Sequence, residues 1–317
     1  MGKIIRIGTR ESQLAIWQAT LTQNRLKNNG FDSELVFIKS EGDVDTITPL
    51  YSIGVTGIFT KALDTALLNN RIDIAVHSMK DVPVQPAQGI KQVAVLKRGS
   101  HKDILVLHPG LSDEKNIFSD SSLKHQVNTD DIIIATSSVR RIAQWLHKYP
   151  DHKIENLRGN VNTRLQKLKE SNWHGAIFAA AGLERIGLRP ENSVDLDWML
   201  PAPAQGAIMM VCRENDLFCI EACQHLNDAH TELCTKLERD FLSALLGGCS
   251  TPISAFAKVE SKNVSFEGNI VSPDGKQKAS VKMQLPVDES KEIGFMAAKK
   301  ILETGGQAIV DSLKNKE

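Results

Sequence analysis

The chain has 317 residues, 41% of them hydrophobic, and its 38 basic residues balance its 38 acidic residues. It is long enough for two or three domains, while the balanced charge and 5% aromatic content argue against nucleic-acid binding. No apolar run approaches the roughly 20 residues of a membrane-spanning helix, and no apolar signal segment opens the sequence. Five cysteines without Cys-x-x-Cys spacing indicate reduced thiols, so we expect a cytoplasmic protein without membrane partners.

The first third of the chain alternates strand-like and helical patterns. Strands are predicted at residues 4–8, 34–39, 72–76 and 92–96, and helices at 13–28 and 58–69. Residues 40–57 form a predicted long loop with three glycines. This alternation is typical of a parallel or mixed sheet with helices on both faces.

The same plan begins again after a crossing segment at 97–102. Strands are predicted at 104–107, 132–135, 153–157 and 176–180, helices at 139–148 and 161–170, and a polar insertion at 112–131. Ile7-Gly8-Thr9-Arg10 resembles Ile134-Ala135-Thr136-Ser137, which indicates duplicated architecture. Pro201 and Pro203 mark a second crossing before a predicted strand at 207–211 that returns to the first sheet. Two crossings between similar units predict two hinged lobes.

The last part of the chain predicts a smaller α+β domain. A helix at 230–246 precedes strands near 253–259 and 264–271, a turn at 273–276, a further strand, and helices near 289–303 and 308–314. We therefore predict an α/β fold with two lobes joined by a hinge, plus a small α+β C-terminal domain. The expected boundaries are 1–97 with 206–225 for the first lobe, 102–200 for the second, and 228–317 for the last domain.

A polar cluster, His77-Ser78-Met79-Lys80-Asp81, follows the buried strand predicted at 72–76. Pro83 prevents regular continuation of the strand, so Lys80 and Asp81 should lie in a loop at its carboxyl end. Ligands of open α/β sheets bind at that edge. A cation and a carboxylate there could hold an anionic substrate and move a proton. The alternative is a solvated pair on a turn, since most exposed pairs contribute little.

Arginines recur where predicted strands pass into helices. Helix N-termini bind anions, and guanidinium groups recognise carboxylates in a bidentate manner. Arginines facing one cleft would suit a ligand with several carboxylates or phosphates, whereas solvated or structural pairs are the alternative at each position. The set comprises Arg10, Arg140, Arg141, Arg158 and Arg164, with hydroxyl donors from Thr136, Ser137 and Ser138. Glycine-rich phosphate-loop motifs are absent from the sequence.

Two cysteine patterns suggest chemistry. Cys249 follows two glycines at the end of a predicted apolar helix, which could expose its thiol as a nucleophile or covalent tether. Burial as a small core residue is an equally good interpretation. Cys219 and Cys223 lie four residues apart with His225 and His230 nearby, but one helical pair is a weak metal pattern, so no metal is expected.

Six motifs in order carry a family resemblance: 8–12, 73–83, 136–141, 157–164, 203–206 and 247–249. With them the sequence resembles the porphobilinogen deaminase (hydroxymethylbilane synthase) family over essentially its whole length. The resemblance implies two lobes like those of periplasmic binding proteins, a third domain, and a dipyrromethane cofactor held by a thioether at Cys249. It also implies a monomeric transferase of tetrapyrrole and haem biosynthesis. Such an enzyme condenses four porphobilinogens head to tail, releases ammonia and hydrolyses off 1-hydroxymethylbilane.

The resemblance also implies roles for individual residues. Asp81 matches the family's catalytic carboxylate, which assists ammonia loss and stabilises a cationic intermediate and the pyrrole N–H groups. Cofactor-binding residues would be Ser78, Lys80, Asp81, Thr136, Ser137, Ser138, Arg140, Arg141 and Arg164. Substrate-binding residues would be Arg10, Ser12, Arg158, Arg164 and Gln205, the last at the hinge and cleft.

The sequence departs from the family pattern in three places. Ser52 and Thr56 stand where lysines are common, Gln13 replaces a frequent proline, and the insertion at 112–131 has no clear counterpart. Two other classes also explain parts of the sequence. A non-catalytic, two-lobed anion-binding protein would account for the arginines and hinge, and a cysteine-nucleophile transferase would account for Cys249. Only the deaminase should carry a stable pyrrole adduct in its intact mass.

Overall fold

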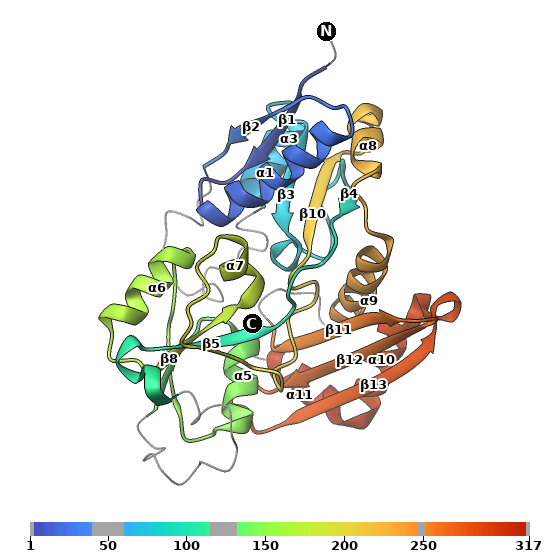
Figure 1. Ribbon diagram of the computed structural model, residues 1–317. Helices are drawn as coiled ribbons and strands as arrows, with labels where there is room; N and C mark the ends of the chain where they lie inside the picture. Colours follow the sequence, from blue (N-terminus) through green and yellow to red (C-terminus); the bar gives the residue numbers. More distant parts are fainter. Residues whose placement is uncertain (1–2, 40–59, 115–131, 246–250, 315–317) are drawn as a thin grey trace.

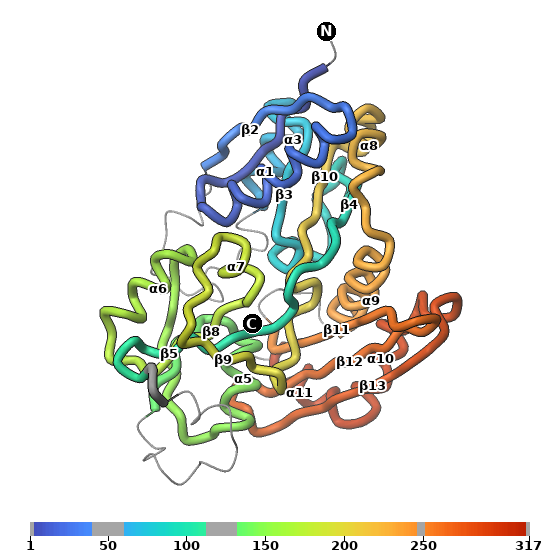
Figure 2. The backbone as a smooth tube through the Cα atoms, viewed as in Figure 1, coloured from blue at the N-terminus to red at the C-terminus, as the bar shows by residue number. Residues whose placement is uncertain are grey.

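The computed structural model describes residues 3–39, 60–114, 132–245 and 251–314 (Figure 1, Figure 2). The predicted loop at 40–57 with Ser52 and Thr56, most of the 112–131 insertion, and Cys249 lie outside these ranges. Within them, no helix is both long and apolar enough to cross a lipid bilayer.

The first lobe is built on a mixed five-stranded sheet in the order β2-β1-β3-β10-β4. Its strands are β1 (Ile5–Thr9), β2 (Ser33–Phe37), β3 (Ile74–Ser78), β4 (Ile90–Val95) and β10 (Ile208–Arg213). β1 pairs in parallel with β2 and β3, whereas β10 runs antiparallel to β3 and β4. Helices α1 (Gln13–Asn28) and α8 (Leu217–Gln224) pack on one face and α3 (Lys61–Leu68) on the other.

The second lobe repeats this design in the order β7-β6-β8-β5-β9. Its strands are β5 (Asp103–Leu107), β6 (Ile133–Ala135), β7 (Lys153–Glu155), β8 (Gly175–Ala179) and β9 (Ser193–Asp195). β6 pairs in parallel with β7 and β8, and β5 runs antiparallel to β8 and β9. Helices α5 (Val139–Lys148), α6 (Val161–Glu170) and α7 (Ala180–Arg185) cover the sheet. The matching order and strand directions support the duplication that the sequence repeat indicated.

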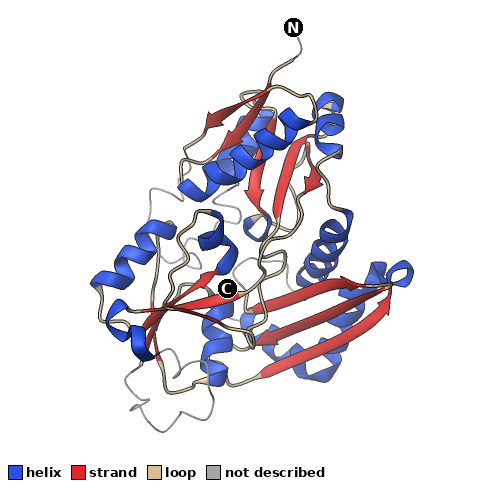
Figure 3. Ribbon diagram, viewed as in Figure 1, coloured by secondary structure: helices blue, strands red, loops and turns tan. Residues whose placement is uncertain are grey.

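The C-terminal domain is a three-stranded antiparallel sheet with helices on one face (Figure 3). It contains α9 (Ala229–Leu245), β11 (Ile253–Glu260), β12 (Asn263–Val271), β13 (Lys278–Pro286), α10 (Ile293–Ile301) and α11 (Gln307–Lys314). Short turns of helix, Val287–Glu292 and Leu302–Gly306, flank α10. Buried apolar residues of α9, α10 and α11 form one core with the sheet. Figure 1 shows α9 between this sheet and β4 of the first lobe.

The two crossing segments touch backbone to backbone at the hinge. The Gly99 amide donates to the Gly206 carbonyl at 3.0 Å. Gly206 has φ +87, and a Cβ there would lie 2.5 Å from the Ser100 carbonyl oxygen, so both the conformation and the close approach require glycine. Arg98 pairs with Glu238 of α9 at 2.6 Å, and the fully buried Glu238 also accepts hydrogen bonds from the amides of Ala204 and Ala257. The hinge therefore joins all three units.

Helices with clear apolar periodicity match their predicted bounds, whereas several strand ends differ. α1, α5 and α6 begin and end where the sequence predicted. β3 continues through His77 and Ser78, because Met209 and Ile208 of β10 pair with them. The Lys80–Asp81 segment forms a short 3-10 helix, Met79–Asp81, rather than an irregular loop. The sequence did not predict α7 or β9. α7 has six residues and β9 has three, and segments this short do not show a recognisable hydrophobic period. The proposed domain boundaries stay a prediction.

Candidate functional site

The turn after β3 places Lys80 and Asp81 at the carboxyl edge of the first sheet. The buried Met79 anchors this turn, because its amide donates to the Ala207 carbonyl at 3.1 Å. Val82 is extended before Pro83, which ends the turn. Ser78 accepts a hydrogen bond from Gln18 Nε2 at 2.9 Å, so its hydroxyl is held by α1. Asp81 itself is exposed, as a group that meets a ligand must be.

Arg140 and Arg141 lie at the start of α5 and are both buried against Asp103 of β5. Arg140 Nη1 lies 2.8 Å and Arg141 Nη2 2.7 Å from the Asp103 carboxylate, which is fully buried. Arg140 also donates to the Leu200 carbonyl and Arg141 to the Ile177 carbonyl. Both arginines therefore form structural ion pairs, which was the alternative to ligand binding. These pairs do not occupy every N–H donor of the two guanidinium groups. Arg140 Nε is buried without a hydrogen-bond acceptor in the described part of the chain.

Opposite charges compensate one another in this buried group. Burial by itself would raise the pKa of Asp103, but Arg140 and Arg141 lower that pKa well below its ordinary value. Burial lowers the pKa of Arg140, and the Asp103 carboxylate partly offsets this effect. Asp103 is therefore ionised and holds two guanidinium groups in place.

Electrostatic interactions link the first lobe's turn to the arginines of the second lobe. Burial lowers the pKa of Lys80 to about 8; Asp81 opposes this shift, and Arg141 adds to it. Burial likewise lowers the pKa of Arg164 to about 10; Arg141 adds to that shift, and the Asp81 carboxylate opposes it. Lys80 also interacts with Asp103 and Arg140. Charged side chains at the carboxyl edges of the two sheets thus interact with one another and form one charged group.

Arg158 lies between β7 and α6, and Arg164 lies in the first turn of α6. Arg158 is buried, and its charge acts on Arg164. Arg164 Nε donates to the Gly159 carbonyl at 2.7 Å, which fixes the guanidinium at the start of α6. The two arginines therefore lie close enough to interact with each other, and Arg164 also interacts with Asp81, while their substrate- and cofactor-binding roles stay predictions.

Arg10 and Ser12 lie between β1 and α1, on the first lobe. Ser12 is the N-cap of α1, and its hydroxyl accepts a hydrogen bond from the Ala15 amide at 3.4 Å. Burial lowers the pKa of His77 to about 4, and the charge of Arg10 lowers it further. Arg10 is thus placed beside His77, next to the turn that carries Asp81.

The three hydroxyl residues before α5 are partly committed to holding the backbone. Ser137 Oγ accepts from the Leu157 amide at 2.9 Å and lies 2.7 Å from the Leu157 carbonyl, which fastens this turn to the segment before α6. Thr136 is buried, and its hydroxyl accepts from the Ser138 amide at 3.3 Å. These contacts place the three residues at the carboxyl edge of the second sheet and leave their cofactor-binding roles as predictions.

Gln205 is fully buried at the hinge. Its Nε2 donates to the His101 carbonyl at 2.7 Å and to Asp103 at 3.0 Å, and its Oε1 accepts from Arg140 at 3.5 Å. Gln205 therefore touches the arginine pair while its amide is engaged by the hinge. Its substrate-binding role stays a prediction.

Sequence reasoning missed Asp103 and Gln18. A carboxylate that opens the apolar run Ile104–Leu107 is a signal for a buried ion pair, because unpaired charges are rarely buried. Gln18 lies three or four residues from Leu14 and Leu21 on the apolar stripe of α1, which is the pattern of a buried hydrogen bond.

The cysteines within the described ranges do not form a reactive or metal-binding group. Cys212, Cys219, Cys223 and Cys234 are buried free thiols, and burial raises the pKa of Cys223 to about 12. No group of three or more His, Cys, Asp or Glu side chains there could hold a metal ion. Cys219 and Cys223 belong instead to the core beneath α8.

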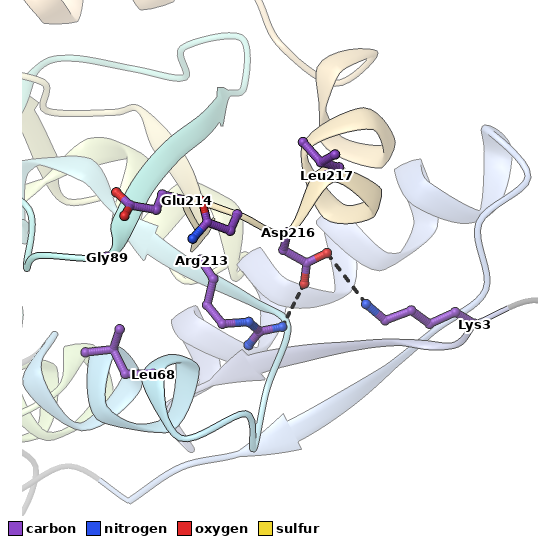
Figure 4. Close-up of a pocket in the computed structure, with 8 residues that line it drawn as sticks. Lys3, Leu68, Gly89, Arg213, Glu214, Asp216 and Leu217 are labelled. Carbon is purple, nitrogen blue, oxygen red and sulfur yellow. Dashed lines mark hydrogen bonds and ion pairs between the residues drawn. The ribbon is translucent and has the colours of Figure 1, made fainter.

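A pocket of about 460 Å³ lies at the opposite edge of the first sheet (Figure 4). Its lining includes Lys3 before β1 and Arg213 at the end of the antiparallel β10, so it lies at the amino ends of the parallel strands. Figure 4 shows Asp216 between Lys3 and Arg213, with which it forms ion pairs. Ligands of such sheets bind at carboxyl ends, so this pocket is not the candidate site.

Two family models together match most of the chain. Residues 5–221 match the family model described as "Porphobilinogen deaminase, dipyromethane cofactor binding domain", and residues 232–303 match "Porphobilinogen deaminase, C-terminal domain". Among solved structures, the methionine-binding protein MetQ is 13% identical, with a TM-score of 0.43 over 70% of this chain and 89% of that chain.

Three curated relatives span nearly the whole chain. "Porphobilinogen deaminase" of Trichlorobacter lovleyi is 38% identical and that of a Geobacillus species 38%, each covering 99% of this chain and 98% of the relative. The chloroplastic enzyme of Oryza sativa subsp. japonica is 39% identical, covering 98% of this chain and 87% of the relative. The chain belongs to the porphobilinogen deaminase family.

Proposed function

We propose that this protein condenses four porphobilinogens on a covalent dipyrromethane primer, releases ammonia and then frees 1-hydroxymethylbilane by hydrolysis. The observation that carries the proposal is the charge of the site. Among the described residues, Lys80, Arg140, Arg141, Arg158 and Arg164 interact electrostatically within one group that includes the carboxylates of Asp81 and Asp103, so five positive against two negative charges leave a surplus of three. Such a surplus in a poorly solvated site suits a ligand with several carboxylates. Porphobilinogen, which bears an acetate and a propionate, is that kind of ligand.

The residues at the site fit a bound dipyrromethane. Arg140 holds a buried Nε donor for which the described residues offer no acceptor, and Lys80 and Arg164 have pKa values lowered by burial, which an anionic group would raise again. When bound, the cofactor supplies the pyrrole to which the first substrate is joined. We propose that Lys80, Arg140, Arg141 and Arg164 hold its carboxylates, with Ser78, Thr136, Ser137 and Ser138 as hydroxyl partners. We propose Cys249, four residues beyond the end of α9, as the point of attachment.

Asp81 is the proposed catalytic residue. Its exposed carboxylate can accept hydrogen bonds from pyrrole N–H groups and stabilise the positive charge that develops as ammonia leaves. The Asp81 carboxylate interacts electrostatically with Lys80 of the same turn and with Arg164 of the second lobe. We propose that these neighbouring cations hold the substrate's side chains while Asp81 acts on the reacting pyrrole.

The incoming porphobilinogen is proposed to contact Arg10, Ser12, Arg158, Arg164 and Gln205. Arg10 and Ser12 approach from the first lobe, and Arg158 and Arg164 from the second. We further propose that the enzyme is a monomer of the cytoplasm. The buried, unpaired thiols of the four described cysteines are compatible with that reducing compartment.

Intact mass tests the proposal directly. The purified protein should carry the mass of a dipyrromethane adduct, and porphobilinogen should add further pyrrole increments. Cys249→Ser should lose the adduct and the colour reaction of pyrroles with an aldehyde reagent, whereas Cys234→Ser serves as a matched control that keeps both. An unmodified wild-type mass would point to an anion-binding protein or a transferase with an open thiol. Retention of the adduct in Cys249→Ser would rule out the attachment point.

A further inference from the structure

Arg239 of α9 reaches from the C-terminal domain to the turn that carries Lys80 and Asp81. Its Nη1 donates to the carbonyls of Val82 at 2.9 Å and Met79 at 3.4 Å. Its Nη2 donates to Pro83 at 2.6 Å and Val84 at 3.1 Å. One guanidinium thus binds four carbonyl groups of a six-residue segment, residues 79–84, which we name the Asp81 turn.

A guanidinium group is chemically suited to this arrangement. It presents five N–H donors in a rigid plane, so it can serve several carbonyls that point to one place. An ammonium group has three donors on a single nitrogen and cannot span the same set. The bonds join residues 155 to 160 positions apart in sequence, so they fix the turn relative to another domain.

Two kinds of contact join the turn to the C-terminal domain. Val84 packs against the apolar core of that domain, while Arg239 binds the carbonyl groups. A cavity of about 410 Å³ opens between them and includes Met79, Val84, Leu233, Lys236 and Arg239 in its lining, so small solutes can reach the guanidinium. On its other side the turn is anchored by the Met79 amide, which donates to the Ala207 carbonyl.

We propose that Arg239 is a positioning residue for the reaction: it holds the Asp81 turn so that the Asp81 carboxylate stands at the reacting pyrrole. This inference rests on the proposed function. It assigns to the C-terminal domain a part in catalysis besides carrying the cofactor's attachment point. Misplacement of a catalytic group by about 1 Å can lower a rate by about 100-fold, so loss of the four bonds should act mainly on kcat.

The test is chemical rescue of Arg239→Ala in the cofactor-loaded enzyme. The variant should keep its adduct mass and a KM within about threefold of wild type while kcat falls on the order of 10- to 100-fold. Amide hydrogen exchange in the Asp81 turn should rise. Millimolar guanidinium chloride can enter through the cavity and should restore both kcat and exchange protection, whereas sodium chloride at equal ionic strength should not.

Lys236→Ala is the matched control. Lys236 lies three residues earlier on α9 and lines the same cavity, but its ammonium pairs with Asp240 instead of the turn. It should show wild-type kcat and no response to guanidinium. If Arg239→Ala does not fold, Arg239→Lys takes its place, with the same fall in kcat and rise in exchange expected.

Three results would overturn the proposal. These are unchanged exchange in the turn, increased exchange with wild-type kcat, and a lowered kcat that guanidinium does not restore in Arg239→Ala. A failure of the proposed function looks different, because then the wild-type protein itself would lack an adduct and turnover. In that case, amide hydrogen exchange of Arg239→Ala would still show whether Arg239 holds the Asp81 turn in place.

Discussion

The two lobes share one strand order but place their charged groups differently. In the first lobe, the third parallel strand, β3, ends in the turn with Lys80 and the exposed Asp81. The matching strand of the second lobe, β8, is followed by Ala180-Ala181-Gly182, the three uncharged residues that begin α7. There the charges follow β6 and β7 instead, as Arg140, Arg141 and Arg158.

This difference shows that the duplicated fold preserves the position of the site but not its chemistry. The carboxyl edges of both sheets contribute, one with an exposed carboxylate and the other with buried guanidinium groups. Asp103, on the antiparallel strand β5, holds the second set in place. We therefore expect changes in the second lobe to affect stability and ligand loading, and changes at Asp81 to affect rate alone.

The largest expected effect is on stability in the second lobe. Breaking a buried ion pair costs about 3–5 kcal/mol, so Asp103→Asn, Arg140→Leu and Arg141→Leu should each lower the free energy of unfolding by about that amount. Urea denaturation would measure it. Arg189→Leu, which breaks partly exposed ion pairs of the same lobe, should cost no more than about 1 kcal/mol.

Intact mass of the same variants separates structural from binding roles. Arg140→Leu and Arg141→Leu should be largely free of cofactor, whereas Asp103→Asn keeps both guanidinium groups and should still load. Arg10→Leu should load but stall in elongation. Fully loaded Arg140→Leu and Arg141→Leu beside an empty Arg10→Leu would mean that the cofactor binds against the first lobe.

The next effect is on rate in the first lobe. Asp81→Asn keeps the shape of the side chain and removes its negative charge, which should raise the barrier by about 3–4 kcal/mol and lower kcat on the order of 100- to 1000-fold. The variant should keep the adduct and wild-type stability, since Asp81 is exposed. Asp151→Asn, another exposed carboxylate, is the control. Near-normal turnover of Asp81→Asn would assign the catalytic role to another group.

The pH dependence of kcat/KM should report the ionisation of Lys80, which interacts with charged groups of both lobes. The pKa of Lys80 is lowered to about 8, so its charge is lost as the pH rises through that value, and kcat/KM should fall there. Lys80→Arg keeps its charge and should shift the falling limb upward by at least one pH unit. An unshifted limb would assign the titration to a different residue.

The free energy of unfolding should rise with pH over a range in which kcat/KM falls. The folded pKa of Lys80 lies below the ordinary 10.5, so the unfolded chain binds more protons between about pH 8 and 10.5. The contribution of Lys80 to the free energy of unfolding should therefore rise with pH across that window. The rise should be smaller in Lys80→Met, and equal slopes in the two proteins would contradict the lowered pKa.

The smallest effect is expected where the lobes touch at the surface. Asn162 Nδ2 of α6 donates to Gln13 Oε1 of α1 at 3.0 Å, and both side chains are exposed. Asn162→Ala should change stability by less than about 1 kcal/mol and kcat by less than about fivefold. Stopped-flow kinetics would check this, and a larger loss would show that this contact controls closure of the lobes.

The sequence by itself determined the local structure and the order of the motifs. α1, α5 and α6 follow from apolar periodicity, and the placement of Lys80 and Asp81 follows from an apolar strand stopped before Pro83. These features depend on neighbouring residues, so they are visible without a fold. The alternation of strands and helices likewise predicted the two lobes and the C-terminal domain.

Only the tertiary structure decided which charges are paired. Asp103 lies 38 residues before Arg141, and Arg239 lies 157 residues after Val82, yet both contacts are direct. Periodicity carries no information on such partners, because each side chain's burial depends on elements that meet only when the sheets assemble. For the same reason the sequence could propose five arginines for the ligand, while the fold showed that two of them also hold the second lobe together.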